Sequence, residues 1–213
     1  MEATFPMRRS ASSYALLLLS VGVLLAISGC GNFFVSNSSL DHITLSPVSV
    51  LLVPGDTDQF SATAVNVGGD QSDITSTATW TSSTPAVATV DNAGKVTAAS
   101  QLASTTITAA SGSVKGTALV MVVASPLPGN LSVTSNATSG NVPVGQTAQL
   151  NAFAGSTNVN QVVSWSSSNT SAATIDANGL VTGVSGSTSQ VTFTATAVTA
   201  TGQISGSISL TIG

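Results

Sequence analysis

The chain has 213 residues, of which 6% are charged and 42% are hydrophobic. After Gly29 it contains seven Asp, two Lys, one His and no Arg, which gives this part of the chain a net charge of −5. Nucleic-acid binding requires clustered Lys and Arg that displace counterions from phosphates, so the composition excludes nucleic acid as a partner.

Residues 1–29 have the pattern of a signal peptide. Arg8 and Arg9 precede an apolar run over residues 15–27, and the sequence Ile27-Ser28-Gly29-Cys30 follows. A bilayer span needs about 20 apolar residues, so this shorter run is typical of a signal peptide. An aliphatic residue, two small residues and Cys resemble a bacterial lipobox. That resemblance implies cleavage between Gly29 and Cys30 and attachment of lipid to the thiol of Cys30.

The cysteine count agrees with lipidation. Cys30 is the only Cys, so no intramolecular disulfide can form, and an exported free thiol needs an explanation. The alternative is an ordinary secreted protein in which this Cys has no role. Two or more acyl chains hold a protein stably, so we expect the membrane as a partner through Cys30, with residues 30–40 as a tether. In bacterial lipoproteins the next residue influences sorting. The lipobox resemblance therefore implies that Gly31, rather than Asp, favours the outer membrane or cell surface over the inner membrane, if the cell has an outer membrane.

The rest of the chain contains one block twice. WTSSTPAVATVDNAGKVTA covers residues 80–98 and WSSSNTSAATIDANGLVTG covers residues 165–183, at a constant offset of 85. Solenoid repeats have periods of about 20–50 residues, so this offset indicates duplication of a whole domain. We therefore predict domains over residues 41–124 and 130–213, joined by a Pro-containing linker over residues 125–129.

Both domains alternate apolar residues with Ser and Thr, which predicts half-buried strands and no amphipathic helix. In the first domain the predicted strands cover residues 42–47, 50–53, 59–65, 77–82, 86–90, 95–98, 105–109 and 115–123. In the second they cover residues 131–134, 147–154, 162–166, 172–176, 180–182, 190–198 and 203–212. The hairpin turn at residues 91–94 places Gly94 in the left-handed region. About seven short strands per domain predict an all-β chain with two β-sandwiches.

The order of motifs resembles a known family. Val-Pro-Gly-Asp-Thr over residues 53–57, Phe-Ser-Ala-Thr-Ala over residues 60–64 and the Trp block resemble the bacterial immunoglobulin-like domain, group 2. The second copy shows the pattern again from residue 144. The resemblance covers almost all of residues 41–213. Members of this family look like intimin- and invasin-type surface modules. The resemblance implies two tandem Ig-like β-sandwich domains on the cell envelope, but it implies no particular ligand.

Few residues could support chemistry. Catalysis needs a base placed beside an acid or nucleophile, and the only His after Gly29, His42, has Asp41 beside it. We interpret this as a polar pair at a domain boundary and predict no enzyme and no cofactor. Asp56 and Asp58, with Asp70 and Asp73, could bind Ca²⁺ through loop oxygens. Turn capping is the preferred interpretation, because the second domain has Gln146 and Ala148 in place of Asp56 and Asp58.

Trp80 and Trp165 could be stacking platforms for sugars, but their mid-strand position favours a place in the cores. Taken together, the sequence predicts a non-catalytic, lipid-anchored envelope protein that mediates adhesion or ligand contact. The expected partner is a polysaccharide or another envelope protein. The alternative is a structural spacer that binds no ligand. Divergence between the domains outside the Trp block would favour a specific site, and interchangeable surfaces would favour the spacer.

Overall fold

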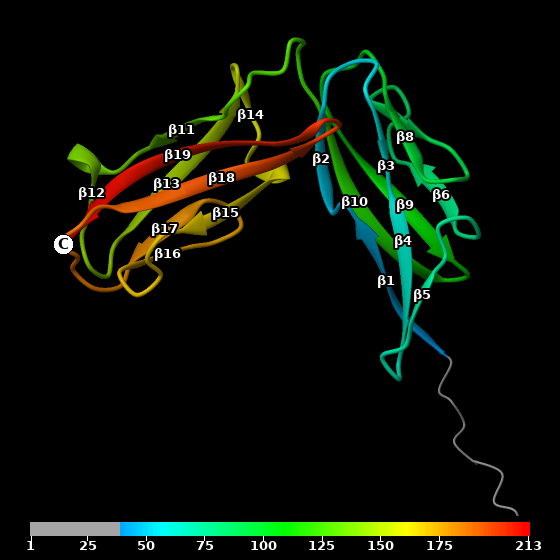
Figure 1. The fold of residues 1–213 in the computed structure, drawn as a ribbon, viewed down its shortest axis with the longest axis horizontal. Helices are drawn as coiled ribbons and strands as arrows, with labels where there is room; N and C mark the ends of the chain where they lie inside the picture. The colour runs from blue at the N-terminus through cyan, green and yellow to red at the C-terminus, as the bar shows by residue number, and fades with distance from the viewer. Residues whose placement is uncertain (1–38) are drawn as a thin grey trace, which may run out of the picture. The chain divides into compact units, whose positions relative to one another are not determined.

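The computed structural model describes residues 39–213, whose regular structure consists of β-strands and two short 3-10 turns (Figure 1). The first domain contains β1 (Leu40–Ser46), β2 (Ser49–Leu52), β3 (Thr57–Gln59), β4 (Ser61–Asn66), β5 (Gln71–Asp73), β6 (Thr79–Ser82), β7 (Ala88–Val90), β8 (Lys95–Ala98), β9 (Ser104–Ser111) and β10 (Val114–Val122). The second contains β11 (Ser132–Ser135), β12 (Asn141–Val142), β13 (Thr147–Ala154), β14 (Thr157–Asn158), β15 (Val163–Ser167), β16 (Ala173–Ile175), β17 (Leu180–Gly183), β18 (Val191–Thr199) and β19 (Gly202–Ile212). Two 3-10 turns, η1 (Thr138–Gly140) and η2 (Asn160–Val162), complete it.

Alternation of side chains explains why these segments are strands. In β18, every second residue from Val191 to Thr199 is buried, and the Thr residues between them face outward. Successive side chains of a strand point to opposite faces of a sheet, so Phe193 and its apolar neighbours enter the core while the hydroxyls meet solvent. β9 and β13 follow the same rule.

Each domain is a sandwich of two sheets. In the first domain, β2, β10, β9 and β6 lie side by side and face β1-β4-β5 and β3-β8-β7. In the second domain, β12, β19, β18 and β15 face β11-β13-β17-β16. β2 runs parallel to β10 with Ser49 opposite Leu119, and β12 runs parallel to β19 in the same way. The prediction of an all-β chain with two tandem sandwiches is confirmed.

The short strands depart from the sequence prediction. The predicted strand over residues 59–65 is two strands, β3 and β4, because the backbone at Phe60 bonds to the Gly94 carbonyl between them. The chain thus passes from pairing with β8 to pairing with β1. The sequence also missed β5, β12 and β14, which have only two or three residues each and too few positions for an alternating pattern.

Each sandwich has its own core, and a third cluster joins the two domains. Phe60 lies in the first core and Phe193 in the second. The third cluster contains Leu51, Met121 and Val123 of the first domain, packed with residues of the second domain that include Leu131, Ala152, Val159, Val162 and Ala197. β18 also pairs with β2, with Thr199 opposite Leu51, so one eight-stranded sheet contains strands of both domains. Full burial of a side chain such as Leu51 contributes about 1.5–3 kcal/mol.

Candidate functional site

The repeated Trp block is a packing unit. Gly94 has φ +80°, and a Cβ atom there would lie 2.5 Å from the Phe60 carbonyl oxygen and 2.9 Å from Cζ2 of Trp80. Gly179 has φ +83°, and a Cβ there would lie 3.2 Å from Cε2 of Trp165. The glycine of each turn is thus required both by its left-handed backbone, as predicted, and by the ring beneath it. The block recurs because the ring and the turn pack against each other.

The two tryptophans differ in their polar contacts. Trp80 is 7% exposed, and its Nε1 donates a hydrogen bond to the Thr75 carbonyl at 2.8 Å. Trp165 is half-buried and packs against the apolar clusters of the second domain, but its buried Nε1 has no partner among the described residues. Both rings therefore pack in the sandwich interiors, where they fill space.

A second repeated contact escaped the sequence comparison. The side-chain Nε2 of Gln59 donates to the carbonyls of Phe60 and Ala93, and Gln149 bonds in the same way to Leu150 and Asn178. These glutamines lie 21 residues before Trp80 and 16 residues before Trp165, so they do not share the offset of the Trp block. The two copies therefore differ in length just before the Trp.

That stretch is built differently in the two domains. The first domain forms β5 there, and the second forms β14 and η2. In the first domain, Thr75 Oγ1 accepts a hydrogen bond from the Ala62 amide at 2.9 Å. In the second, Asn160 Oδ1 accepts from the Ala152 amide at 2.7 Å. Asn160 thus takes over a structural role and brings its neighbour Gln161 to the surface.

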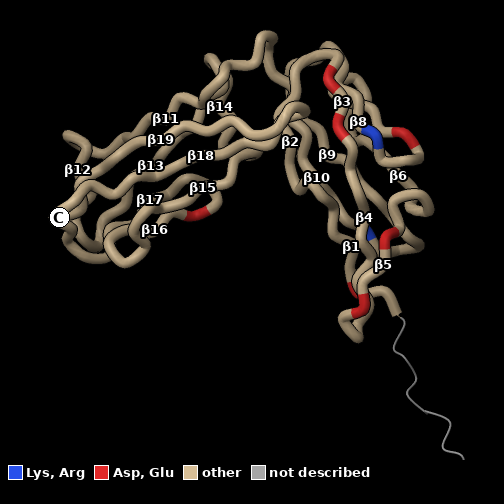
Figure 2. The backbone as a smooth tube through the Cα atoms, viewed as in Figure 1, with Lys and Arg blue, Asp and Glu red and all other residues tan. Residues whose placement is uncertain are grey.

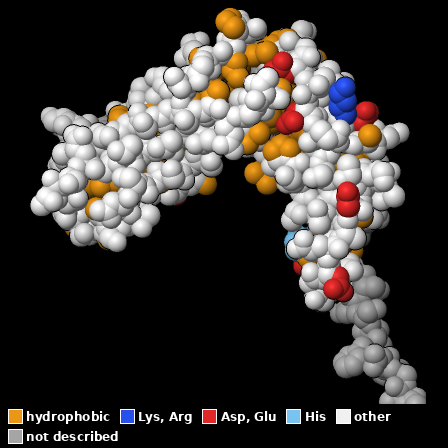
Figure 3. All heavy atoms as spheres, viewed as in Figure 1, with side chains coloured by type: hydrophobic (Ala, Val, Ile, Leu, Met, Phe, Trp, Pro, Cys, Tyr) orange, Lys and Arg blue, Asp and Glu red, His pale blue; other side chains and the backbone are white. Residues whose placement is uncertain are grey.

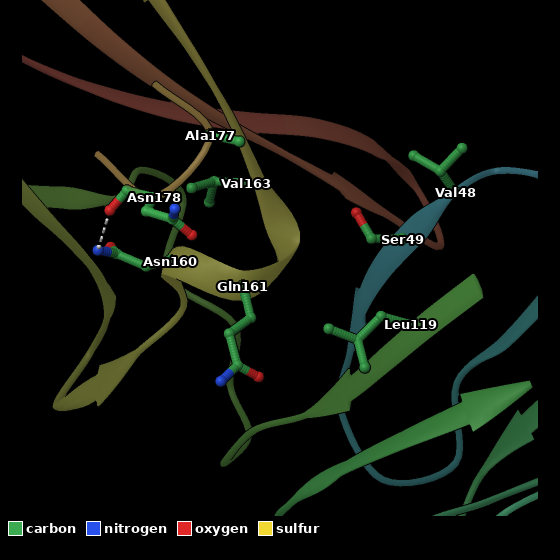
Figure 4. A pocket seen from close by; sticks show the side chains of 8 residues that line it. All are labelled: Val48, Ser49, Leu119, Asn160, Gln161, Val163, Ala177 and Asn178. Atoms are coloured by element: carbon green, nitrogen blue, oxygen red, sulfur yellow. Dashed lines mark hydrogen bonds between the residues drawn. The ribbon is translucent and has the colours of Figure 1, made fainter. Parts of the chain in front are cut away.

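Gln161 faces a cleft of about 480 Å³ where the two domains meet (Figure 4). From the first domain, Val48, Ser49 and Leu119 line it. From the second domain, the lining includes Gln161, Asn178 and Val163. Among the described residues, every lining side chain is uncharged. The sequence did not point to this cleft, and the unequal Gln–Trp spacing marks only the stretch of the second domain that carries Gln161.

Charge is unevenly divided between the domains. Asp176 is the one charged residue in residues 130–213, whereas residues 41–124 contain six Asp, two Lys and one His. Figure 2 shows the Asp and Lys positions concentrated in the first domain. Asp176 Oδ1 accepts hydrogen bonds from the amides of Asn178 and Leu180, so this carboxylate stabilises its own turn. The visible face of the second domain is correspondingly free of charged side chains (Figure 3).

The outer face of the second domain carries hydroxyls in rows. Thr192, Thr194 and Thr196 of β18 lie opposite Ser209, Ser207 and Ser205 of β19, and Ser166 and Ser164 of β15 continue two of the rows. The matching face of the first domain is interrupted by Lys115, Ala110 and Leu119. Some hydroxyls of the second domain are already bonded, since Thr192 and Ser209 share a hydrogen bond of 2.9 Å.

Asp56 and Asp58, the calcium candidates, have local roles. Asp56 Oδ2 accepts a hydrogen bond from the Val53 amide at 3.1 Å and so caps the turn. Asp58 Oδ1 accepts a hydrogen bond from the Gln59 amide, but its buried Oδ2 has no partner within residues 39–213, and burial raises the pKa of this carboxyl. The second domain has the buried Ala148 at this place. Within residues 39–213, the His, Cys, Asp and Glu side chains form no group of three or more that could hold a metal ion.

The remaining predicted residues lie elsewhere. His42 Nδ1 lies 2.8 Å from Asp41 Oδ2 at the start of β1, and both side chains are more than half exposed. Gly29 and Cys30, with the predicted signal peptide and most of the tether, fall outside the described residues. In the described part of the chain, no helix has the length and apolar character that crossing a membrane requires.

Comparison with known proteins finds several to which this chain is similar. An ice-binding protein from Shewanella frigidimarina is 32% identical over 159 residues, which are 72% of this chain but only 17% of that protein. Domains 5-6 of the S-layer protein SbsC match 82% of the chain and 97% of that fragment at 22% identity, with a TM-score of 0.36. Murine CEACAM1b matches 81% of the chain and 99% of its own length at 12% identity, with a TM-score of 0.29.

The sequence pattern of the bacterial Ig-like domain (group 2) matches residues 39–122 and again residues 130–205. The first match covers the first sandwich, the second covers its sandwich as far as residue 205 in β19, and each includes its Trp and its left-handed glycine. The chain therefore belongs to the family of bacterial Ig-like domains, group 2, and carries two of them in tandem.

Proposed function

We propose that this protein is a lipid-anchored adhesion module of the bacterial envelope whose second domain contacts a neutral polysaccharide. The observation that carries the proposal is the segregation of charge. The second domain has one charged side chain, and that carboxylate is bonded to two backbone amides of its own turn. Such a surface offers hydrogen bonds without an electrostatic field, which suits an uncharged, hydroxyl-rich partner.

Divergence between the domains also supports a specific contact. If the domains only separated neighbours in space, their surfaces would be interchangeable. Instead, the hydroxyl rows are continuous on the second domain and interrupted by Lys115 and Leu119 on the first. The stretch before the Trp differs as well, with β5 in one domain and η2 in the other. The two copies share the packing unit and differ at the surface.

The anchor is the second part of the proposal. It rests on the Ile27-Ser28-Gly29-Cys30 sequence and on the absence of any other Cys. Growth of expressing cells with an alkyne-labelled palmitate tests it. The wild-type chain should incorporate label and partition into detergent, and a Cys30→Ser variant should lose both properties. Label that persists in the variant would refute lipidation at Cys30.

Binding is tested with the soluble chain from residue 31 onward, which contains the compact unit 39–213. Cellulose, chitin, starch and isolated envelope polysaccharide serve as solid phases, and ice is added because one relative is an ice-binding protein. Saturable retention on a neutral polysaccharide that persists at 1 M salt, a roughly 3 Å Debye length, supports the proposal. Retention only at low salt would refute it, because it would reveal a charged partner.

The spacer function remains the second candidate, and the shared cluster around Leu51 and Met121 favours it. Buried apolar contact between the domains stiffens a stalk and needs no ligand. The two functions predict different results. A spacer binds none of the solid phases, and exchange of its second domain for an unrelated Ig-like domain of similar length preserves its role in cells.

A further inference from the structure

We infer that the cleft between the two domains is the binding site, and that it takes a neutral saccharide. This inference rests on the proposed function and names the site for it. Ligand sites occur preferentially at domain interfaces and have volumes of about 300–1,000 Å³. At about 480 Å³, this cleft falls within that range.

Two amide side chains in the cleft are free to bind a ligand. Gln161 and Asn178 are exposed, and their side chains make no hydrogen bond to other described residues. A side-chain amide offers both donors and an acceptor, as a sugar hydroxyl does, so the two groups can satisfy each other in either direction. Figure 4 shows the Gln161 side chain directed into the space beside Leu119.

Asn160, in contrast, holds the site together. Its Oδ1 accepts a hydrogen bond from the Ala152 amide, and its Nδ2 donates to the carbonyls of Leu150 and Asn178 (Figure 4). These bonds fix the turn that carries Asn178 relative to η2, which carries Gln161. Asn160 is therefore a positioning residue, because it fixes the backbone that carries the two free amides before any ligand arrives.

The opposite side of the cleft is mostly apolar, because its one polar side chain, Ser49, is bonded to the Val162 carbonyl. Val48 is 74% exposed in the turn between β1 and β2, and Leu119 on β10 lies beside it. An exposed side chain of this kind leaves apolar surface in water unless a ligand covers it. A pyranose ring has hydroxyls on its edge and C–H groups on its faces. Amides on one side and Val48 with Leu119 on the other therefore match the two kinds of surface of a sugar.

The two sides of the cleft are held together by direct contacts. Ser49 Oγ donates a hydrogen bond to the Val162 carbonyl at 3.3 Å, next to Gln161. Leu51, two residues further, pairs with Thr199 of the second domain and is fully buried. A ligand in this cleft touches both domains at once, and neither domain alone provides the site.

The cleft suits a saccharide better than the hydroxyl rows do. In the rows, the hydroxyls of Thr192 and Ser209 are already bonded to each other. The cleft also has no counterpart within the first domain, where Ala93 stands in place of Asn178. Finally, the lining among described residues is uncharged, which disfavours a phosphorylated or acidic ligand.

The test measures Kd by titration calorimetry with the soluble chain from residue 31. Cellohexaose, maltohexaose and chitohexaose are the neutral probes, and a polygalacturonate hexamer is the charged one. We expect binding of a neutral probe, and a Gln161→Ala/Asn178→Ala variant should weaken it by about tenfold or more, because two hydrogen bonds are lost. The matched control, Gln203→Ala/Asn92→Ala, removes the same two amides from exposed positions outside the cleft and should change Kd less than about twofold.

A third variant, Ser207→Asp, places a charge on the hydroxyl rows and should leave Kd unchanged. Loss of binding in Ser207→Asp but not in Gln161→Ala/Asn178→Ala would show that the ligand binds at the hydroxyl rows. That result would overturn the inference that the cleft is the binding site, while the proposed function would stand. Tighter binding of polygalacturonate, or no binding of any neutral probe or polysaccharide, would overturn both. Sedimentation could instead reveal a dimer that only the Gln161→Ala/Asn178→Ala variant abolishes. That result would show that the cleft binds a second copy of the chain and would refute the inference that it binds a saccharide.

Discussion

The two tryptophans allow one prediction that the sequence alone would get wrong. Trp80 and Trp165 are the aligned residues of a duplicated block, so equal costs on substitution would be the simple expectation. The structure predicts unequal costs. Trp80→Phe removes a hydrogen bond of 2.8 Å and leaves the Thr75 carbonyl without its donor. Trp165→Phe removes an N–H group that is buried without a partner.

The magnitudes follow from these contacts. Each substitution loses packing contacts and leaves a small cavity, at a cost of about 1–2 kcal/mol. For Trp80 the part-buried Thr75 carbonyl loses its donor, which adds up to about 1–3 kcal/mol. For Trp165 the substitution also removes the desolvation cost of its unbonded N–H group, which offsets part of the packing loss. Trp80→Phe should therefore destabilise its domain by about 1–3 kcal/mol more than Trp165→Phe does.

Scanning calorimetry and urea unfolding measure the difference. For a domain of this size, 1 kcal/mol corresponds to a Tm shift of about 4–8 °C. Because each domain has a single Trp, fluorescence of either variant reports on the unmodified domain, and circular dichroism follows the whole chain. Equal losses for the two variants, or a larger loss for Trp165→Phe, would refute the reasoning. In both variants the saccharide Kd should remain unchanged.

Three further substitutions test other contacts. Asp58→Ala should raise Tm at pH 7, because burial raises the carboxyl pKa in the folded state and so penalises its charged form. The stability that Asp58 contributes is fully present below its pKa in the unfolded chain and is lost as pH rises through its pKa in the folded chain. The difference in Tm between Asp58→Ala and wild type should therefore shrink toward pH 3. A Tm difference that does not change with pH would contradict this. Calorimetric titration of wild type and Asp58→Ala with Ca²⁺ tests the metal alternative, which predicts heat in wild type alone. Gly94→Ala should cost more in urea unfolding than Gly112→Ala, because only the Cβ at Gly94 meets other atoms, and equal costs would argue against this packing. Leu51→Ala should cost about 2–5 kcal/mol and separate one calorimetric transition into two, and a single unshifted transition would rule out a shared cluster.

The long strands and the duplicated unit could be predicted because they leave a regular trace in the sequence. β18 alternates buried and outward residues over its whole length, and the Trp block repeats at one offset. β5 left no such trace, since all three of its residues are exposed. A strand is recognised through the surface it buries, and β5 buries none.

The cleft could not be predicted for a different reason. Leu51 and Met121 have the sequence pattern of ordinary core residues, and nothing in the sequence tells which core they enter. Gln161 and Asn178 are two polar residues among many, and only the packing of η2 against the neighbouring turn brings them together. Contacts between domains depend on both surfaces at once, so a pattern within either domain is silent about them.

The parallel pairing of β2 with β10 has a mechanical consequence. Tension applied along the chain would reach β2 from its N-terminal side, after β1, and would leave the first domain past the C-terminal end of β10. In parallel strands these two ends lie at opposite ends of the pair, from Ser49–Leu119 to Leu52–Val122. The tension therefore loads all the hydrogen bonds between β2 and β10 in shear, and they share the force. An antiparallel hairpin pulled at its open end, in contrast, loses its hydrogen bonds one at a time. β12 also runs parallel to β19, so tension along the chain loads a second parallel pair of strands in shear in the second domain.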